Sequence, residues 1–246
     1  MSYKDLTASA IGTSIAEFIT LPICTIKTNY QTNLQYKSIV DVAKEIYSMR
    51  GLYGFYSASF AAVGLQIIST STKYSFYNYF RDYRVTAKND MKNNIINGVL
   101  GGIVSSVAVH WVDVIKIHKQ NGLKFLDELK STGPKIFYRG YSKSLSKSVV
   151  LTASLFPLND YYKSKTNNTL LAAGLSSFTV TSIVHPFDYL KVRHISDQTL
   201  YPKFSNIPDF FKYYYRGVHV NLMRVMPHFM ITMLITEKIK KQFESN

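Results

Sequence analysis

Six long stretches of the chain are rich in Leu, Ile, Val and aromatic residues and contain few Gly or Pro breaks. They cover residues of roughly 6–30, 58–83, 93–118, 141–163, 169–193 and 218–240. At about 23–26 residues, each stretch is long enough to cross a bilayer as a helix. Ser, Thr and an occasional charged residue interrupt every stretch, and such residues in a spanning helix normally face a bundle interior or a watery cavity. The pattern predicts an all-α membrane protein with six transmembrane helices.

Two short motifs recur three times in the same order along the chain. The first closes the odd-numbered stretches and reads PICTIK at 22–27, WVDVIK at 111–116 and PFDYLK at 186–191. The second precedes the even-numbered stretches and reads FYSA at 55–58, FYRG at 137–140 and YYRG at 214–217. Self-similarity at a regular spacing indicates a repeat architecture. We therefore expect one domain over residues 1–246, built from repeats of about 1–85, 86–165 and 166–246.

The charge balance of the chain favours an anionic partner. Its 246 residues include 29 Lys and Arg against 15 Asp and Glu, a formal net charge of +14. Nucleic acid, acidic lipid and a small anionic solute all fit such an excess. The lysines are spread along the chain, not gathered in one helix or arm, which argues against nucleic acid. The single cysteine, Cys24, excludes an internal disulfide framework and a cysteine-only metal cluster.

Enzymatic chemistry has no recognisable motif in this sequence. There is no Gly-rich phosphate loop, no nucleophile elbow and no clustered pair of carboxylates. His110 and His185 each precede a motif aspartate by three residues, but two separated histidines do not make a metal site. We expect them to be hydrogen-bonded polar residues lining a barrel. The sequence thus predicts no enzyme, no cofactor and no metal. No targeting signal is evident in the first residues.

The tripled motifs resemble those of the mitochondrial carriers, in which P-x-[DE]-x-x-[KR] closes each odd-numbered helix and an aromatic-basic-glycine signature precedes each even-numbered one. The resemblance covers nearly the whole chain. It implies a threefold pseudosymmetric six-helix barrel in the inner mitochondrial membrane, which exposes a solute site near mid-membrane to each side in turn. The composition, rich in Asn, Lys, Ile and Tyr, is expected of A+T-rich coding, and a divergent viral or protist member would fit it.

The resemblance also implies a matrix gate of ion pairs between neighbouring repeats. Its residues here are Asp113 with Lys191, Asp188 with Lys27, and Lys116 facing the position of Cys24. Since Cys24 replaces the family's acid, we expect one of three links to be missing. Helix kinks are expected at Pro22 and Pro186, whereas Trp111 replaces the proline of the second repeat. The short spacing from motif to signature in the second and third repeats predicts trimmed matrix-side helices.

The cytoplasmic gate implied by the family is depleted in this chain. Its candidate residues are Asp160, Lys163, Glu237 and Lys240, and only Asp160 with Lys240 remains as a family-type pair. The corresponding segment at residues 79–83, YFRDY, has lost both charges of the family pattern. A carrier-like membrane protein that no longer transports is therefore one alternative.

The solute site is expected about 13 or 14 residues before each even-helix gate, which is nearly a whole number of helical turns. That step reaches Gln66, Lys147 and Arg224, with Lys73 and Lys143 on neighbouring faces and Glu17 on the first helix. We expect Glu17 to neutralise Arg224 or Lys147.

A surplus of positive charge in a low-dielectric barrel favours a multiply charged anion. Lysines suit phosphate groups, and the abundant Tyr and Phe offer stacking surfaces for a base, so exchange of nucleotides or deoxynucleotides is the favoured function. Dicarboxylate or phosphate is the alternative. The expected partners are a small anionic solute and membrane lipid, with cardiolipin as a candidate, and the protein is expected to be monomeric.

Overall fold

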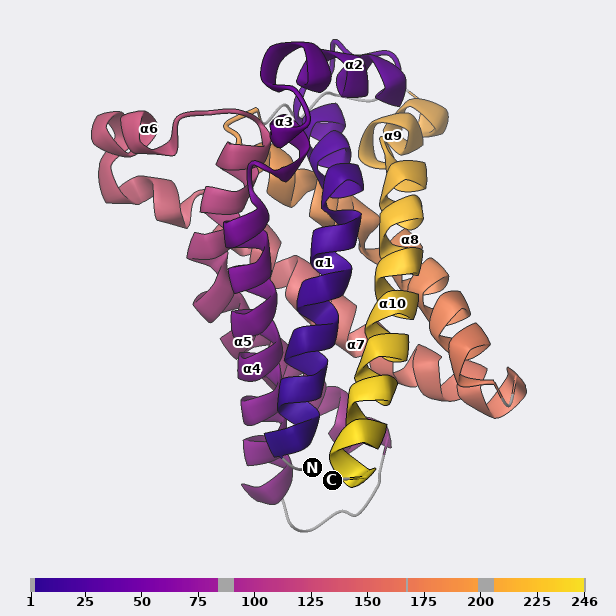
Figure 1. Ribbon diagram of the computed structural model, residues 1–246. Coiled ribbons are helices and arrows are strands. Elements are labelled where there is room, and N and C mark those ends of the chain that lie inside the picture. The colour runs from indigo at the N-terminus through magenta and orange to yellow at the C-terminus, as the bar shows by residue number, and fades with distance from the viewer. Residues whose placement is uncertain (1–2, 84–90, 167, 199–205, 246) are drawn as a thin grey trace.

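A computed structural model describes residues 3–83, 91–166, 168–198 and 206–245 of the chain (Figure 1). Within them lie six long helices: α1 (Tyr3–Thr32), α4 (Ser59–Tyr83), α5 (Met91–Gln120), α7 (Tyr141–Thr166), α8 (Thr169–Ile195) and α10 (Val218–Ser245). Each coincides with one of the six predicted stretches, so those predictions are confirmed. The first helix begins and the last helix ends at the same end of the molecule, as expected for an even number of crossings (Figure 1).

The six long helices form a closed ring. In ring order each helix packs on the next, from α1 through α4, α5, α7, α8 and α10 back to α1. Glycines allow close approach at two of these seams. A Cβ atom on Gly12 would lie 2.6 Å from Thr236 Oγ1 across the α1–α10 seam, and one on Gly102 would lie 2.8 Å from Thr152 Oγ1 across the α5–α7 seam. Small residues at such positions let helix backbones pack closely in lipid.

The outward and inward faces of the ring differ in chemistry. On α1 the exposed apolar residues Ile11, Ile15 and Phe18 follow a helical spacing, and Leu171, Leu175 and Phe178 do the same on α8. Within the described residues, three helical segments are long and apolar enough to cross a membrane: Leu6–Thr32, Val99–Gln120 and Val218–Phe243, with a bent pair, Ile39–Arg50 and Tyr53–Thr72, as a potential fourth.

Short helices gather at the end of the ring away from the termini (Figure 1). They are α2 (Ile39–Arg50), α3 (Tyr53–Tyr56), α6 (Phe125–Thr132), the 3-10 helix η1 (Gly133–Tyr138) and α9 (Ile207–Tyr214). We call this end the motif end, because the three charged motifs lead into it. Helix α2 has 12 residues, whereas α6 and α9 have 8 each, in agreement with the predicted trimming of the second and third repeats.

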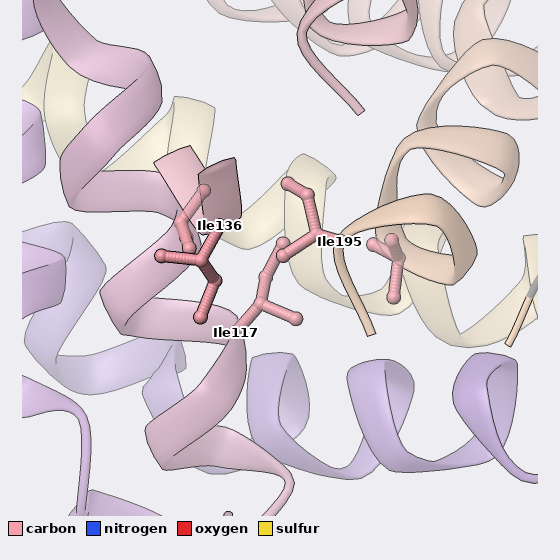
Figure 2. Close-up of a cluster of buried hydrophobic side chains, with 5 residues drawn as sticks. Ile117, Ile136 and Ile195 are labelled. Atoms are coloured by element: carbon pink, nitrogen blue, oxygen red, sulfur yellow. The ribbon is translucent and has the colours of Figure 1, made fainter. Parts of the chain in front are cut away.

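An apolar cluster holds the 3-10 helix η1 against the long helices α5 and α8 at the motif end. It consists of Val114 and Ile117 of α5, Ile136 of η1, and Val192 and Ile195 of α8, all buried. Figure 2 shows Ile117, Ile136 and Ile195 converging on one point. Full burial of one such side chain contributes about 1.5–3 kcal/mol. The cluster therefore fixes the start of α7, which follows η1, against the end of α8.

Arginines tie the three repeats into a cycle at the motif end. Each comes from one repeat and reaches the end of the odd-numbered helix of the next: Arg50 donates to Gln120 O at 3.3 Å, Arg139 lies 3.8 Å from Asp197 just after α8, and Arg216 donates to Tyr30 O at 3.0 Å. The last carbonyls of a helix lack intrahelical partners and carry partial negative charge, so a cation there is favourable. We call this arrangement the arginine cycle.

Both motif prolines lie within continuous helices, Pro22 in α1 and Pro186 in α8. The expected kinks at these prolines stay predictions. Trp111, which replaces the motif proline of the second repeat, is 48% exposed on the outer face of α5, together with Val107. An aromatic side chain at this position therefore faces away from the interior of the ring.

Candidate functional site

The ring encloses a cavity of about 300 Å³ that every long helix helps to line. In ring order from α1, the lining includes Lys27, Gln66, Asp113, Lys147, Asp188 and Arg224, with one residue from each helix. Ser69, Ser105, Ser106, Ser144 and Thr181 add hydroxyl groups. The interior of the ring is thus polar and charged, as the interrupted hydrophobic pattern predicted.

Asp188 binds two lysines at the motif end of the cavity. Lys27 Nζ donates to its Oδ2 and Lys147 Nζ donates to its Oδ1. The side chains of Lys27 and Asp188 are 6% and 7% exposed, so this pair is removed from solvent. We call Asp188 with Lys27 and Lys147 the Asp188 hub. A second pair, Lys191 with Asp113, joins α8 to α5 of the neighbouring repeat. The structure therefore contains both ion pairs that the resemblance implied.

Glu17 binds two further cations deeper in the barrel. Lys116 Nζ donates to Oε1 at 2.6 Å, and Arg224 Nη2 donates to Oε2 at 2.7 Å. Gln66 Nε2 donates to the same Oε2 at 2.9 Å, and His228 Nδ1 lies 3.7 Å from it. We call Glu17 with Lys116 and Arg224 the Glu17 hub. The carboxylate is fully buried, and it neutralises Arg224 as expected.

The expectation that Lys116 lacks an acid is wrong. Glu17 lies seven residues before Cys24, which is about 10.5 Å along the helix axis, and the Lys116 side chain extends to it. The position of the missing acid is instead filled by neutral groups. Gln120 Nε2 donates to Cys24 Sγ at 3.3 Å, and Thr28 Oγ1 donates to Gln120 Oε1 at 2.9 Å. The third link is therefore present, but its acid lies about two helical turns closer to the start of α1 than the motif position.

In each hub, a residue of the predicted gate and a residue of the predicted solute site contact the same carboxylate. Lys147 and Arg224 are the cations that the sequence assigned to the solute site, and each contacts a carboxylate that also holds a motif lysine. Among the described side chains here, five cations (Lys27, Lys116, Lys147, Lys191, Arg224) face three carboxylates (Glu17, Asp113, Asp188). Two positive charges therefore remain without a matching negative charge.

Other predicted site residues lie outside this cluster. Lys143 is half-buried on α7 but is not among the described residues that line the cavity, and the side chain of Lys73 lies outside the described part. At the end of the ring near the termini, Lys163 and Glu237 are exposed.

The remaining two cytoplasmic-gate residues cannot be placed against each other. The side chains of Asp160 and Lys240 lie outside the described residues, so their ion pair stays a prediction.

The two motif histidines are hydrogen-bonded, as predicted, but neither is among the described residues that line the cavity. His110 Nδ1 lies 2.9 Å from Ser144 Oγ, and His185 Nε2 lies 3.1 Å from the carbonyl oxygen of Arg216. Each histidine thus connects an odd-numbered helix to the start of the even-numbered helix, or to the turn before it, in the same repeat. His228 lines the cavity one turn after Arg224, a spacing that places both side chains on one helical face.

A closed helical ring around a charged, polar cavity defines the class of membrane solute carriers. A family model described as mitochondrial carrier protein matches residues 1–88 and 162–246, and the chain belongs to that family. A mitochondrial carrier-like protein of Acanthamoeba polyphaga mimivirus is 42% identical over 244 residues, which cover 98% of this chain and 97% of that protein. A mitochondrial substrate carrier family protein of Dictyostelium discoideum is 22% identical over 257 residues, covering 83% and 81%.

The second repeat is the divergent part of the chain. The family model leaves residues 89–161 unmatched, and this segment contains Trp111 in place of the motif proline. The similarity to a viral relative over nearly the whole chain fits the expected divergent viral member. Family membership makes the protein a multi-pass membrane transporter and not one of the enzyme classes.

Proposed function

We propose that the protein exchanges anionic metabolites across the inner mitochondrial membrane by alternating access, with nucleotides or deoxynucleotides as the favoured solutes. The observation that carries the proposal is the surplus of two positive charges in the cavity, where five cations face three carboxylates among the described residues. Inside a low-dielectric barrel this surplus attracts a multiply charged anion far more strongly than a neutral or cationic solute.

The arrangement of the cations suits a phosphate tail. Lys147 on α7 and Arg224 on α10 line one cavity from different helices, and their side chains are 28% and 15% exposed. A lysine acts as a point charge, whereas an arginine can bind two oxygens at once. A nucleoside phosphate can therefore place neighbouring phosphate groups on the two side chains. Gln66 and Asn221 supply hydrogen-bonding groups for a base or a sugar.

A smaller dianion is the second candidate, because the cavity is poor in aromatic rings. The tyrosines counted in favour of base stacking do not line it, and among its described lining residues Phe229 supplies the phenyl ring. Serine and threonine hydroxyls around a surplus of two positive charges also fit a dicarboxylate or hydrogen phosphate. The two candidates differ in their need for Phe229.

Exchange in liposomes tests the proposal. Vesicles containing the purified protein are loaded with ATP, dATP, malate, oxoglutarate or phosphate, and uptake of each labelled anion is measured with and without internal counter-solute. We expect uptake of nucleotides that depends on an internal anion. Uptake of the carboxylates without nucleotides would reject the nucleotide proposal, and no uptake by folded protein would favour a carrier that has lost transport.

Two substitutions and a matched control locate the solute site. Arg224→Ala and Lys147→Ala should each lower exchange tenfold or more, since each removes a direct charged contact of about 1.5–3 kcal/mol. Lys143→Ala removes a lysine from the same helix as Lys147, away from the described cavity lining, and should leave exchange within about twofold. Equal losses in Lys143→Ala and Lys147→Ala would contradict the assigned cavity.

Phe229→Leu separates the two solute classes. Loss of base stacking costs about 1–3 kcal/mol, so the KM for ATP should rise about tenfold while the KM for malate stays unchanged. A parallel rise for both anions would indicate a packing role of the ring instead.

A further inference from the structure

We propose that the Glu17 carboxylate replaces the acid missing at Cys24 as the third link of the closed motif end, and that it also competes with the solute anion for Arg224. This inference rests on the proposed function, since it assigns a second role within the same anion site. In this proposal the Glu17 side chain controls both the closure of the motif end and the affinity for the solute anion.

The link role follows from the contact with Lys116. Glu17 Oε1 lies 2.6 Å from Lys116 Nζ, and the two side chains are 0% and 8% exposed. The contact joins α1 to α5, which belong to the first and second repeats. The two other links likewise join neighbouring repeats, Asp188 with Lys27 and Asp113 with Lys191. Glu17 thus completes the cycle of three ion pairs in which Cys24 leaves a gap.

The competitor role follows from the second oxygen of the same carboxylate. Oε2 accepts from Arg224 Nη2 at 2.7 Å and from Gln66 Nε2 at 2.9 Å, and His228 Nδ1 lies 3.7 Å away. Two donor groups, with a histidine nearby, therefore surround an oxygen that belongs to the protein. A carboxylate or phosphate group of a solute carries the same kind of oxygen. An anion that binds Arg224 must displace Glu17 or share the guanidinium with it.

Because of these two roles, removing the negative charge of Glu17 should strengthen solute binding but lower turnover. In Glu17→Gln, Arg224 loses its internal counter-ion, so a solute anion should bind more tightly. At the same time Lys116 loses its acid, so the motif end should close less firmly and turnover should fall. A residue that only supports the fold would lower turnover without improving affinity.

The transport experiment measures both effects in one series. With labelled ATP as the probe, or malate if the liposome assay selects carboxylates, Glu17→Gln should lower the KM about tenfold and reduce the maximal rate. Adding Cys24→Asp restores an acid to the cavity wall that Lys116 and Arg224 also line. The double variant should therefore recover the maximal rate and return the KM toward the parent value. Asp209→Asn, which removes an exposed carboxylate from α9, serves as the control and should change neither value.

A second experiment tests the link without any solute. Cys24 is the chain's single cysteine, lines the cavity and is 5% exposed, so it reports opening of the motif end. We expect a charged, membrane-impermeant maleimide applied from the side of the motif end to label Glu17→Gln about tenfold faster than the parent protein. Glu17→Asp keeps the charge, so its Cys24 should be labelled at a rate between those of the parent protein and Glu17→Gln.

The outcomes separate the inference from the proposed function. An unchanged or raised KM in Glu17→Gln overturns the competitor role, and unchanged labelling of Cys24 overturns the link role. If the parent protein takes up none of the tested anions, the proposed function fails, while the labelling experiment still decides the link. Thermal unfolding in detergent shows whether each variant is folded, and a maximal rate that Cys24→Asp does not recover also counts against the link.

Discussion

The Glu17 hub and the Asp188 hub both link repeats through a buried carboxylate, but the two acids stand at different positions in their helices. Each carboxylate holds one motif lysine and one cation of the cavity: Lys116 and Arg224 for Glu17, Lys27 and Lys147 for Asp188. Asp188 stands at the acidic position of its motif, whereas Glu17 stands seven residues before that position in its own repeat. An inter-repeat link therefore requires a carboxylate within reach of a lysine side chain, not an acid at a fixed motif position.

The hubs also differ in their neutral donors. Glu17 accepts a further hydrogen bond from Gln66 and lies near His228, whereas the Asp188 carboxylate binds the two lysines. A buried carboxylate with extra donors keeps partial compensation when one cation is removed. We therefore expect the Asp188 hub to be the more sensitive of the two, and the following variants test this difference.

The largest effect is expected for Asp188→Asn. The substitution leaves Lys27 and Lys147 without their shared carboxylate, and the Lys27 side chain is 6% exposed. Removing one partner of a buried ion pair costs about 3–5 kcal/mol. Thermal unfolding in detergent should show this loss, and exchange should fall to background. Asp209→Asn removes an exposed carboxylate from α9 and should have little effect; a stable, active Asp188→Asn variant would contradict the hub.

An intermediate effect is expected for Lys116→Met, compared with Lys27→Met. After loss of Lys116, Glu17 still has Arg224 and Gln66, whereas after loss of Lys27 the Asp188 carboxylate keeps Lys147. Lys116→Met should lower the free energy of unfolding by about 1–3 kcal/mol, and Lys27→Met should lower it by more. Both are measured by thermal unfolding under one set of conditions. Equal losses would show that the neutral donors around Glu17 contribute nothing.

The smallest effect is expected for Cys24→Asp alone. Since Lys116 already binds Glu17, a second carboxylate should stabilise the closed motif end by about 1 kcal/mol or less. In the Glu17→Gln background the same substitution should have a larger effect, because Lys116 then lacks an acid. A double-mutant cycle on the rate of exchange measures the coupling between positions 17 and 24. Additive effects would mean that the two positions do not serve the same lysine.

The sequence was sufficient for the helices and for two of the ion pairs. Long apolar stretches with few breaks locate all six long helices, and the family resemblance pairs Asp188 with Lys27 and Asp113 with Lys191. These features depend on backbone spacing, which a repeat makes visible. They require no knowledge of side-chain conformations.

Contacts made by long side chains were harder to predict. The sequence placed Lys116 opposite Cys24 and Lys147 beside Arg224, according to the positions of their backbones. In the structure the amino groups reach Glu17 and Asp188 instead. A lysine side chain spans more than one helical turn and extends toward the nearest carboxylate, so spacing alone does not fix its partner.

The aromatic residues were also difficult to place from the sequence. Their number suggested stacking surfaces in the cavity, but many lie elsewhere in the molecule. Phe210 and Phe211, for example, are exposed on α9 at the motif end. Composition reports how many rings the chain has, and only the arrangement of the helices determines which of them face the solute.

The arginine cycle connects every repeat to the next at the motif end. Arg50, Arg139 and Arg216 each reach the following repeat, and the third reaches back to the first, so the ring has no unattached edge at the motif end. The α1–α10 seam closes the rest, with the first helix beginning beside the end of the last (Figure 1). The order of synthesis therefore has no counterpart in the finished ring. A circular permutant that joins the natural termini and starts at α5 would contain the same set of interfaces.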